Sequence, residues 1–149
     1  MRPAEPVGPR STLIAAIRLP LSPFMHVPEG QLAIVDDDAS VRKALKRLLQ
    51  ASSYTVDTFA SASEFLASLN EHIPDCLIVD LQMPSMNGLE LRISLTRAGI
   101  AIPTIIISAH DESGSRERCS TAGAVAYLLK PIQKIELIAA IKAATIKES

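Results

Sequence analysis

Five short apolar segments alternate with five longer amphipathic or polar segments between residues 31 and 149, and this repeat leaves few folds open. The apolar segments are the predicted strands, which cover residues 31–35, 54–59, 75–80, 102–108 and 124–129. The predicted helices cover residues 39–52, 61–70, 86–99, 111–123 and 133–146. Continuously apolar strands that alternate with helices indicate a parallel sheet covered on both faces. We therefore predict an α/β domain with five parallel strands in the order 2-1-3-4-5.

Three of the predicted helices carry start or stop signals. Asp38 is placed to cap the first helix. Ser61 and Glu64 form a capping-box pattern at the start of the second helix. Gly99 is placed to end the third helix. The boundaries between strands and helices are therefore defined by residue type as well as by hydrophobic periodicity.

The fourth predicted helix, over residues 111–123, is the weakest. Between Glu112 and Thr121 only Cys119 is clearly apolar, and Gly114 lowers the helix propensity further. A helix with so little apolar surface gains little from packing on a sheet. We predict that it is short or frayed and the least stable of the five. Low stability would suit an element that moves, and it is equally compatible with a partner-specific or degenerate output face.

Composition argues against several kinds of partner. The formal net charge is −1 and aromatic residues make up 3% of the chain, so we expect no direct binding to nucleic acid. Cys76 and Cys119 form neither a CxxC pair nor a zinc pattern, which favours two reduced thiols in a cytoplasmic protein. No apolar run approaches the roughly 20 residues that cross a bilayer, so no membrane association is expected.

Residues 1–30 differ from the rest of the chain because they hold six of its ten prolines. We expect a poorly ordered, Pro-rich extension there, followed by one domain over residues 31–149. Met25 lies just before the first strand and is a candidate start of translation. Because no helix-turn-helix pattern or second core follows the fifth helix, we expect a single-domain form whose output passes through binding to another protein or through competition for phosphate.

Polar residues stand where four of the predicted strands end. Asp36 and Asp37 follow the first strand, Asp80 and Ser108 end the third and fourth, and Lys130 follows the fifth. These four strands are neighbours in the predicted order, and their carboxyl ends meet where such sheets bind ligands. Two like charges about 4 Å apart cost about 4 kcal/mol at an effective dielectric of about 20. A hard divalent cation would offset that repulsion, since it prefers oxygen ligands.

The motifs around these residues carry a family resemblance. The segments IVDDDASVR, LIVDLQMPSMNGLEL, PTIIISAH and AGAVAYLLKPI, in this order and spacing, resemble a response-regulator receiver domain, the phosphoacceptor module of two-component signalling. The resemblance covers residues 31–149 and implies a flavodoxin-like, doubly wound (βα)5 fold. It implies a phosphorelay partner, either a histidine kinase or a histidine phosphotransfer protein, that donates a phosphoryl group from a phosphohistidine.

The resemblance also assigns roles to the residues at the strand ends. Asp80 is the expected phosphoacceptor. Asp36, Asp37, Asp80 and the backbone carbonyl of Gln82 are the expected Mg²⁺ site, with Asp36 acting mainly through a bound water. Asp38 is expected to cap the first helix rather than to bind the metal. These assignments agree with the preference of Mg²⁺ for carboxylate and carbonyl oxygens.

Lys130 and the hydroxyl of Ser108 are expected to act on the bound phosphoryl group, and Ser108 and Tyr127 are expected to transmit the signal. Lys130 would pair with a phosphoryl oxygen, and the bond between Lys130 and Pro131 is expected to be cis. Ser108 matches the Ser/Thr switch position and Tyr127 the aromatic switch position. The expected output surface combines the fourth helix, the fifth strand and the fifth helix, and activation could drive formation of a homodimer.

Other functions fit the sequence less well. Phosphatases of the haloacid-dehalogenase type need a second aspartate two residues after the nucleophile, where this chain has Gln82. A P-loop switch would need GxxxxGK[ST], which the sequence lacks. The chain is therefore expected to be a signalling switch rather than a metabolic enzyme. The alternative that stays open is a receiver-shaped protein-interaction module that works without phosphorylation.

Overall fold

The computed structural model describes residues 30–146. Strands and helices alternate throughout this range. They are β1 (Gln31–Val35), α2 (Ala39–Ala51), β2 (Thr55–Phe59), α3 (Ala62–Ser68), β3 (Cys76–Asp80), α4 (Gly88–Arg97), β4 (Thr104–Ser108), α5 (Ser115–Thr121), β5 (Ala126–Leu129) and α6 (Lys134–Thr145).

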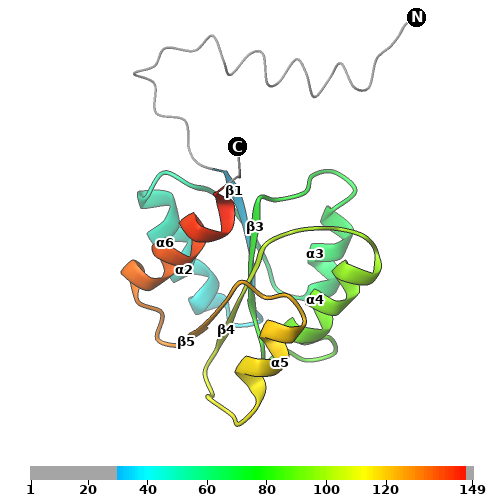
Figure 1. Cartoon of the computed structure of the whole chain (residues 1–149). Helices are drawn as coiled ribbons and strands as arrows, with labels where there is room; N and C mark the ends of the chain where they lie inside the picture. The colour runs from blue at the N-terminus through cyan, green and yellow to red at the C-terminus, as the bar shows by residue number, and fades with distance from the viewer. Residues whose placement is uncertain (1–29, 147–149) are drawn as a thin grey trace, which may run out of the picture.

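The strands form one parallel sheet in the order β2-β1-β3-β4-β5, which confirms the predicted fold class and topology (Figure 1). The register places Val35 beside Val79, Asp80 beside Ile107, and Ser108 beside Leu129. Strands β1, β3, β4 and β5 therefore end at nearly the same level. This alignment brings the polar residues that follow them to a common edge.

Helices cover both faces of the sheet (Figure 1). On one face, α2 and α6 pack through residues such as Leu49 and Ile141 against Ile34 and Ile78 of the sheet. On the other face, α3, α4 and α5 contribute buried side chains that include Phe65, Leu91 and Cys119. Strand β3 is buried along its whole length because it is the central strand of a sheet that helices cover on both faces. Its unbroken apolar sequence follows from that position.

Two helix starts differ in detail from the sequence patterns. Ser61 caps α3 as predicted, since its Oγ accepts the Glu64 N–H at 3.1 Å. The Glu64 carboxylate, however, accepts from the N–H of Ala60 at 3.0 Å, one residue before the cap, so the reciprocal half of a capping box is displaced. A full capping box is present at α4 instead, where Asn87 and Glu90 accept from each other's backbone N–H.

Helix α5 is short, as predicted. It spans seven residues, Ser115–Thr121, and begins four residues later than the helix expected from the sequence. The reason lies at Gly114, which takes a left-handed conformation with φ of 83° and supplies no side-chain cap. Only Ser115 and Cys119 of this helix are buried. It therefore has little apolar contact with the sheet.

Some expectations fall on parts of the chain that the structure does not describe. The extension predicted over residues 1–30 and the start at Met25 lie outside the described residues, apart from Gly30. Among residues 30–146, no helix combines the length and apolar character that crossing a bilayer requires.

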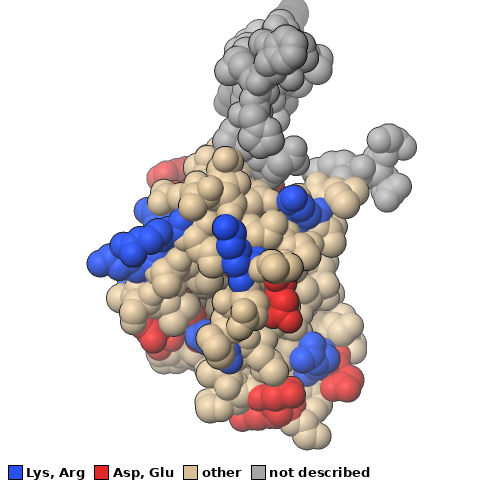
Figure 2. Space-filling view, turned by 90° about the vertical axis from the view of Figure 1, so that its left-hand side faces the viewer, with Lys and Arg blue, Asp and Glu red and all other residues tan. Residues whose placement is uncertain are grey.

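The face formed by α2 and α6 carries basic and acidic side chains side by side (Figure 2).

Candidate functional site

Three carboxylates gather at the carboxyl ends of β1 and β3. Oxygen atoms of Asp36, Asp37 and Asp80 all lie within 4.8 Å of one another. Asp36 is fully buried and Asp80 is 3% exposed, whereas Asp37 faces solvent. The sequence predicted this grouping from the strand ends alone. We call these three residues the acidic cluster.

Lys130 supplies the positive charge of the site, as predicted. Its Nζ donates to Asp36 Oδ2 at 3.0 Å and lies 3.3 Å from Asp80 Oδ1. Burial by itself lowers the pKa of Lys130, but the hydrogen bond and charge of Asp36, together with the charge of Asp80, outweigh it and hold this pKa above its ordinary value. Lys130 is therefore a cation, and its peptide bond to Pro131 is cis, as expected.

The carboxyl of Asp80 has a raised pKa. Burial of the carboxyl, and next the negative charge of Asp36, raise the pKa of Asp80 to about 6, against the opposing charge of Lys130. Its Oδ1 is buried and accepts no hydrogen bond within the described residues. A buried carboxylate oxygen without a donor is costly unless a cation lies beside it. The ammonium of Lys130 meets that need only in part, at 3.3 Å.

The loop after β3 is packed tightly against Asp80. The N–H of Leu81 donates to Ile107 O at 2.8 Å and continues the pairing with β4. The N–H of Gly88 then donates to Leu81 O at 3.2 Å. A Cβ atom at Gly88 would lie 2.7 Å from the carbonyl oxygen of Asp80, so a larger residue would displace the backbone there. Glycine at position 88 thus has a structural reason, which is the close approach of α4 to the backbone of Asp80.

Asp38 belongs to the helix and not to the acidic cluster, as predicted. Its Oδ1 accepts the N–H of Ser40 at 2.9 Å and the hydroxyl of Ser40 at 2.8 Å. Its own N–H donates to Asp36 Oδ1 at 2.9 Å. The hydrogen bond with Ser40 lowers the pKa of Asp38, which keeps the cap ionised. The β1–α2 loop therefore orients Asp36 while it starts α2.

Ser108 ends β4 and joins a network that the sequence did not reveal. Its Oγ lies 3.1 Å from Gln82 Oε1 and 2.8 Å from the carbonyl oxygen of His110. The hydroxyl of Tyr127 donates to the same His110 carbonyl at 3.2 Å. Tyr127 is 7% exposed. The two expected switch residues are thus connected through one backbone carbonyl.

Arg116 has a role beside Tyr127 that the sequence did not predict. Its guanidinium lies 4.7 Å from the centroid of the Tyr127 ring, and its Nη1 donates to the Tyr127 carbonyl oxygen at 3.1 Å. No motif in α5 pointed to this contact. The only available signal was that an arginine in a helix with almost no apolar surface could attach it to an aromatic residue on β5.

The acidic cluster fits a hard divalent cation. All of its side-chain donors are carboxylate oxygens, which suit Mg²⁺ and other hard ions. One of these oxygens, Asp80 Oδ1, is buried without a hydrogen-bond donor. Asp37 contributes a carboxylate on the solvent side. The cluster is therefore suited to a cation that keeps part of its water shell.

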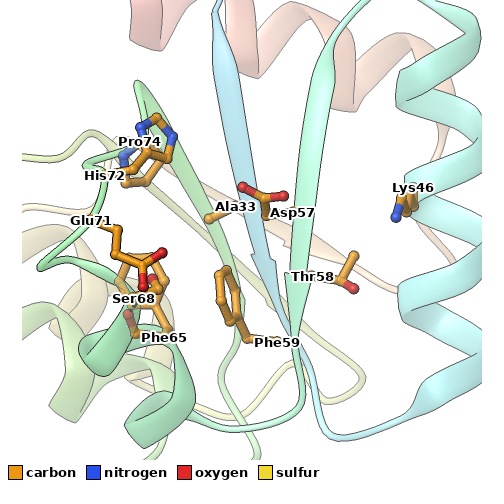
Figure 3. Close-up of a pocket in the computed structure, with 10 residues that line it drawn as sticks. All are labelled: Ala33, Lys46, Asp57, Thr58, Phe59, Phe65, Ser68, Glu71, His72 and Pro74. Carbon is orange, nitrogen blue, oxygen red and sulfur yellow. Dashed lines mark hydrogen bonds between the residues drawn. The ribbon is translucent and has the colours of Figure 1, made fainter.

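A separate cavity of about 400 Å³ lies at the edge strand β2 (Figure 3). Asp57 and Phe59 of β2, Phe65 of α3, and Glu71 and His72 of the following loop are among its lining residues. No residue of the acidic cluster lines it. In the described part of the chain, its acidic and histidine side chains do not form a group close enough to hold a metal.

Comparison with known proteins identifies the family. Residues 32–142 match the model of the response regulator receiver domain. Response regulator protein TodT of Pseudomonas putida is 40% identical over 111 residues, which cover 74% of this chain and 49% of that protein. Nodulation protein W of Bradyrhizobium diazoefficiens is 37% identical over 112 residues, covering 75% of this chain and 49% of that protein.

Solved structures agree with this result. FixJ-N superimposes with a TM-score of 0.73 at 35% identity, covering 81% of this chain and 95% of that one. A response regulator receiver protein from Burkholderia phymatum gives a TM-score of 0.69 at 44% identity, covering 77% and 94%. The chain spans about half the length of relatives such as TodT and nodulation protein W. With the fold, the acidic cluster and the family match in agreement, the chain belongs to the response regulator receiver domain family.

Proposed function

We propose that this receiver domain accepts a phosphoryl group on Asp80 from a phosphohistidine of a histidine kinase or histidine phosphotransfer protein. The observation that carries the proposal is the acidic cluster with the ammonium of Lys130 in contact with two of its carboxylates. Asp80 Oδ1 is buried, free of hydrogen-bond donors in the described residues, and 3.3 Å from Lys130 Nζ. An acceptor carboxylate needs this combination, because it must present an oxygen while nearby cations balance the charge that arrives.

The transfer forms one bond and breaks one. A carboxylate oxygen of Asp80 attacks phosphorus, the P–N bond of the donor phosphohistidine breaks, and the donor imidazole leaves and takes up a proton. The product is an acyl phosphate on Asp80. Lys130 pairs with a phosphoryl oxygen, and the hydroxyl of Ser108 donates to another.

Mg²⁺ is the proposed metal, held by Asp37, Asp80 and the backbone carbonyl of Gln82, with Asp36 acting through water. When bound, it neutralises charge that develops on the phosphoryl group. Asp36 has a second task in this arrangement. Its salt bridge with Lys130 at 3.0 Å keeps the ammonium directed at the acceptor carboxylate.

The signal is proposed to leave through the surface formed by α5, β5 and α6. Exposed apolar side chains lie on and beside these elements, with Val125 52% exposed and Ile135 83% exposed. Covering such side chains would favour binding of a protein there, because apolar surface gains free energy on leaving water. A protein output partner or a second copy of this chain would bind there, and Ser108 and Tyr127 would change position on activation.

Incubation with acetyl phosphate and Mg²⁺ tests the proposal. The expected result is a mass increase of one phosphoryl group that is lost when EDTA is present. Asp80→Asn should abolish the increase, whereas Asp57→Asn, on the exposed edge strand, should leave it unchanged. A mass increase that persists in Asp80→Asn would place the acceptor elsewhere. No increase in the wild-type protein would favour the alternative, an interaction module that works without phosphorylation.

A further inference from the structure

Two hydrogen-bond donors at the end of β4 converge on one side-chain oxygen. Ser108 Oγ lies 3.1 Å from Gln82 Oε1, and the N–H of Ala109 donates to the same oxygen at 3.4 Å. A backbone N–H can only donate, so it fixes the oxygen end of the Gln82 amide toward β4. Gln82 stands two residues after Asp80 and is half-buried. Its side chain thus bridges the loop after β3 and the end of β4.

The Ser108 hydroxyl is fully engaged in this arrangement. It carries one proton, which is shared between Gln82 Oε1 and the His110 carbonyl oxygen at 2.8 Å. Its own oxygen accepts the N–H of His110 at 3.1 Å. Before the hydroxyl can donate to a phosphoryl oxygen on Asp80, it must therefore give up one of these partners.

We propose that Gln82 is a positioning residue whose side-chain oxygen substitutes for a phosphoryl oxygen and holds the Ser108 hydroxyl and the Ala109 N–H in the unphosphorylated protein. This inference rests on the proposed function of Asp80. An amide oxygen is a neutral acceptor, whereas a phosphoryl oxygen is charged and accepts more strongly. The phosphoryl group therefore wins both donors, but only after the bonds to Gln82 break. Gln82 therefore lowers the net affinity of the site for a phosphoryl group by the free energy of the hydrogen bonds that must break.

Beryllofluoride, a phosphoryl analogue, provides the test. It is titrated with excess Mg²⁺ into the wild-type protein, Gln82→Met and Gln50→Met, and binding is followed through the backbone amide resonance of Ala109. Methionine keeps the length of the side chain but removes the acceptor oxygen, and the backbone carbonyl of Gln82 stays in place. We expect Gln82→Met to bind about three- to tenfold tighter, because a net hydrogen bond is worth about 0.5–1.5 kcal/mol. Gln50 is exposed on α2, so the matched change there should have no effect.

A double-mutant comparison separates this role from a general effect on packing. In a Ser108→Ala background, the gain caused by Gln82→Met should fall to about twofold or less, because only the Ala109 N–H remains to be released. If Gln82→Met fails to fold, Gln82→Asn serves instead, since its shorter amide cannot reach β4.

Three outcomes would overturn the inference. One is equal or weaker binding by the Gln82 variants, and another is an undiminished gain in the Ser108→Ala background. In both cases the wild-type protein still binds beryllofluoride, so the proposed function of Asp80 stands. The third is a wild-type protein that does not bind beryllofluoride at all, which defeats the proposed function and this inference together.

Discussion

Lys130 and Asp36 lie 94 residues apart in the chain, yet their charged atoms meet at 3.0 Å. Asp36 is fully buried, and Asp80 beside it is nearly so. Among the described residues, Lys130 is the one basic side chain in salt-bridge contact with either acid. It links β5 to β1 and β3 across the carboxyl edge of the sheet. The site is therefore part of what holds these strands together.

Replacing Lys130 with methionine should destabilise the protein in the absence of Mg²⁺. Two buried carboxyl groups would lose their counter-charge, and breaking a buried ion pair typically costs about 3–5 kcal/mol. The Lys130 side chain is 19% exposed, so we expect a loss somewhat below that range, about 2–3 kcal/mol in the free energy of unfolding. Urea unfolding near neutral pH measures it. The matched change at Lys43, exposed on α2, should have little effect, and an equally small effect at Lys130 would contradict this view of the site.

The raised pKa of Asp80 should make the metal-free protein lose stability as pH rises. The pKa is about 6 in the folded state against 3.8 for an unperturbed carboxyl, so the folded protein binds more protons than the unfolded chain between these values. The contribution of Asp80 to stability therefore falls as pH rises from about 4 to about 6, and levels off above. Since one pKa unit corresponds to about 1.4 kcal/mol, the change is on the order of 2–3 kcal/mol.

Asp80→Asn checks this prediction. Asparagine cannot ionise, so the variant should become more stable than the wild-type protein as pH rises through the same range, in EDTA. Free energies of unfolding measured across this pH range give the difference directly. A constant difference for Asp80→Asn would mean that its carboxyl titrates normally.

Mg²⁺ should stabilise the protein, and Asp37 should account for much of the effect. A ligand that binds only the folded state adds about 2.7 kcal/mol at a concentration of 100 Kd. Asp37→Asn removes the solvent-side carboxylate of the acidic cluster, so we expect about a tenfold weaker affinity, equivalent to about 1.4 kcal/mol. Thermal unfolding with and without MgCl₂ provides the measurement. Asp111→Asn, in the β4–α5 loop and outside the cluster, is the control that should respond to Mg²⁺ as the wild-type protein does.

The sequence predicted those features that depend on hydrophobic pattern and strand order. Apolar runs such as Leu32–Val35 fixed the strands, and their ends located Asp36, Asp80 and Lys130, because neighbouring parallel strands end at one edge. Contacts that depend on side-chain conformation were not predicted. The bond from Ser108 to Gln82 joins the end of β4 to the loop after β3, 26 residues away in the chain, and no local pattern encodes how these segments meet.

Helix α5 has one feature that the sequence predicted and one that it did not. Its shortness followed from Gly114 and from the scarcity of apolar residues, which are local properties. Its attachment through Arg116 to Tyr127 did not, because that contact depends on where β5 lies relative to the helix. The carboxylate of Glu64 gives a similar case. It bonds to Ala60 instead of Ser61, and both arrangements are compatible with the same four-residue pattern.

Helix α5 should exchange its amide hydrogens faster than α2, and Arg116→Ala should increase the difference. Only Ser115 and Cys119 of α5 are buried, so the helix can open without unfolding the sheet. Removing Arg116 eliminates its contact with the Tyr127 ring and its hydrogen bond to the Tyr127 carbonyl, each worth about 0.5–1.5 kcal/mol. We therefore expect exchange in residues 115–121 to accelerate about fivefold or more, with the free energy of global unfolding lowered by no more than the same contacts contribute. Arg97→Ala, at the exposed end of α4, should leave exchange in α5 as it is. Protection in α5 equal to that in α2 would show that the helix is not the weak element, and an unchanged rate in Arg116→Ala would show that Arg116 does not hold it.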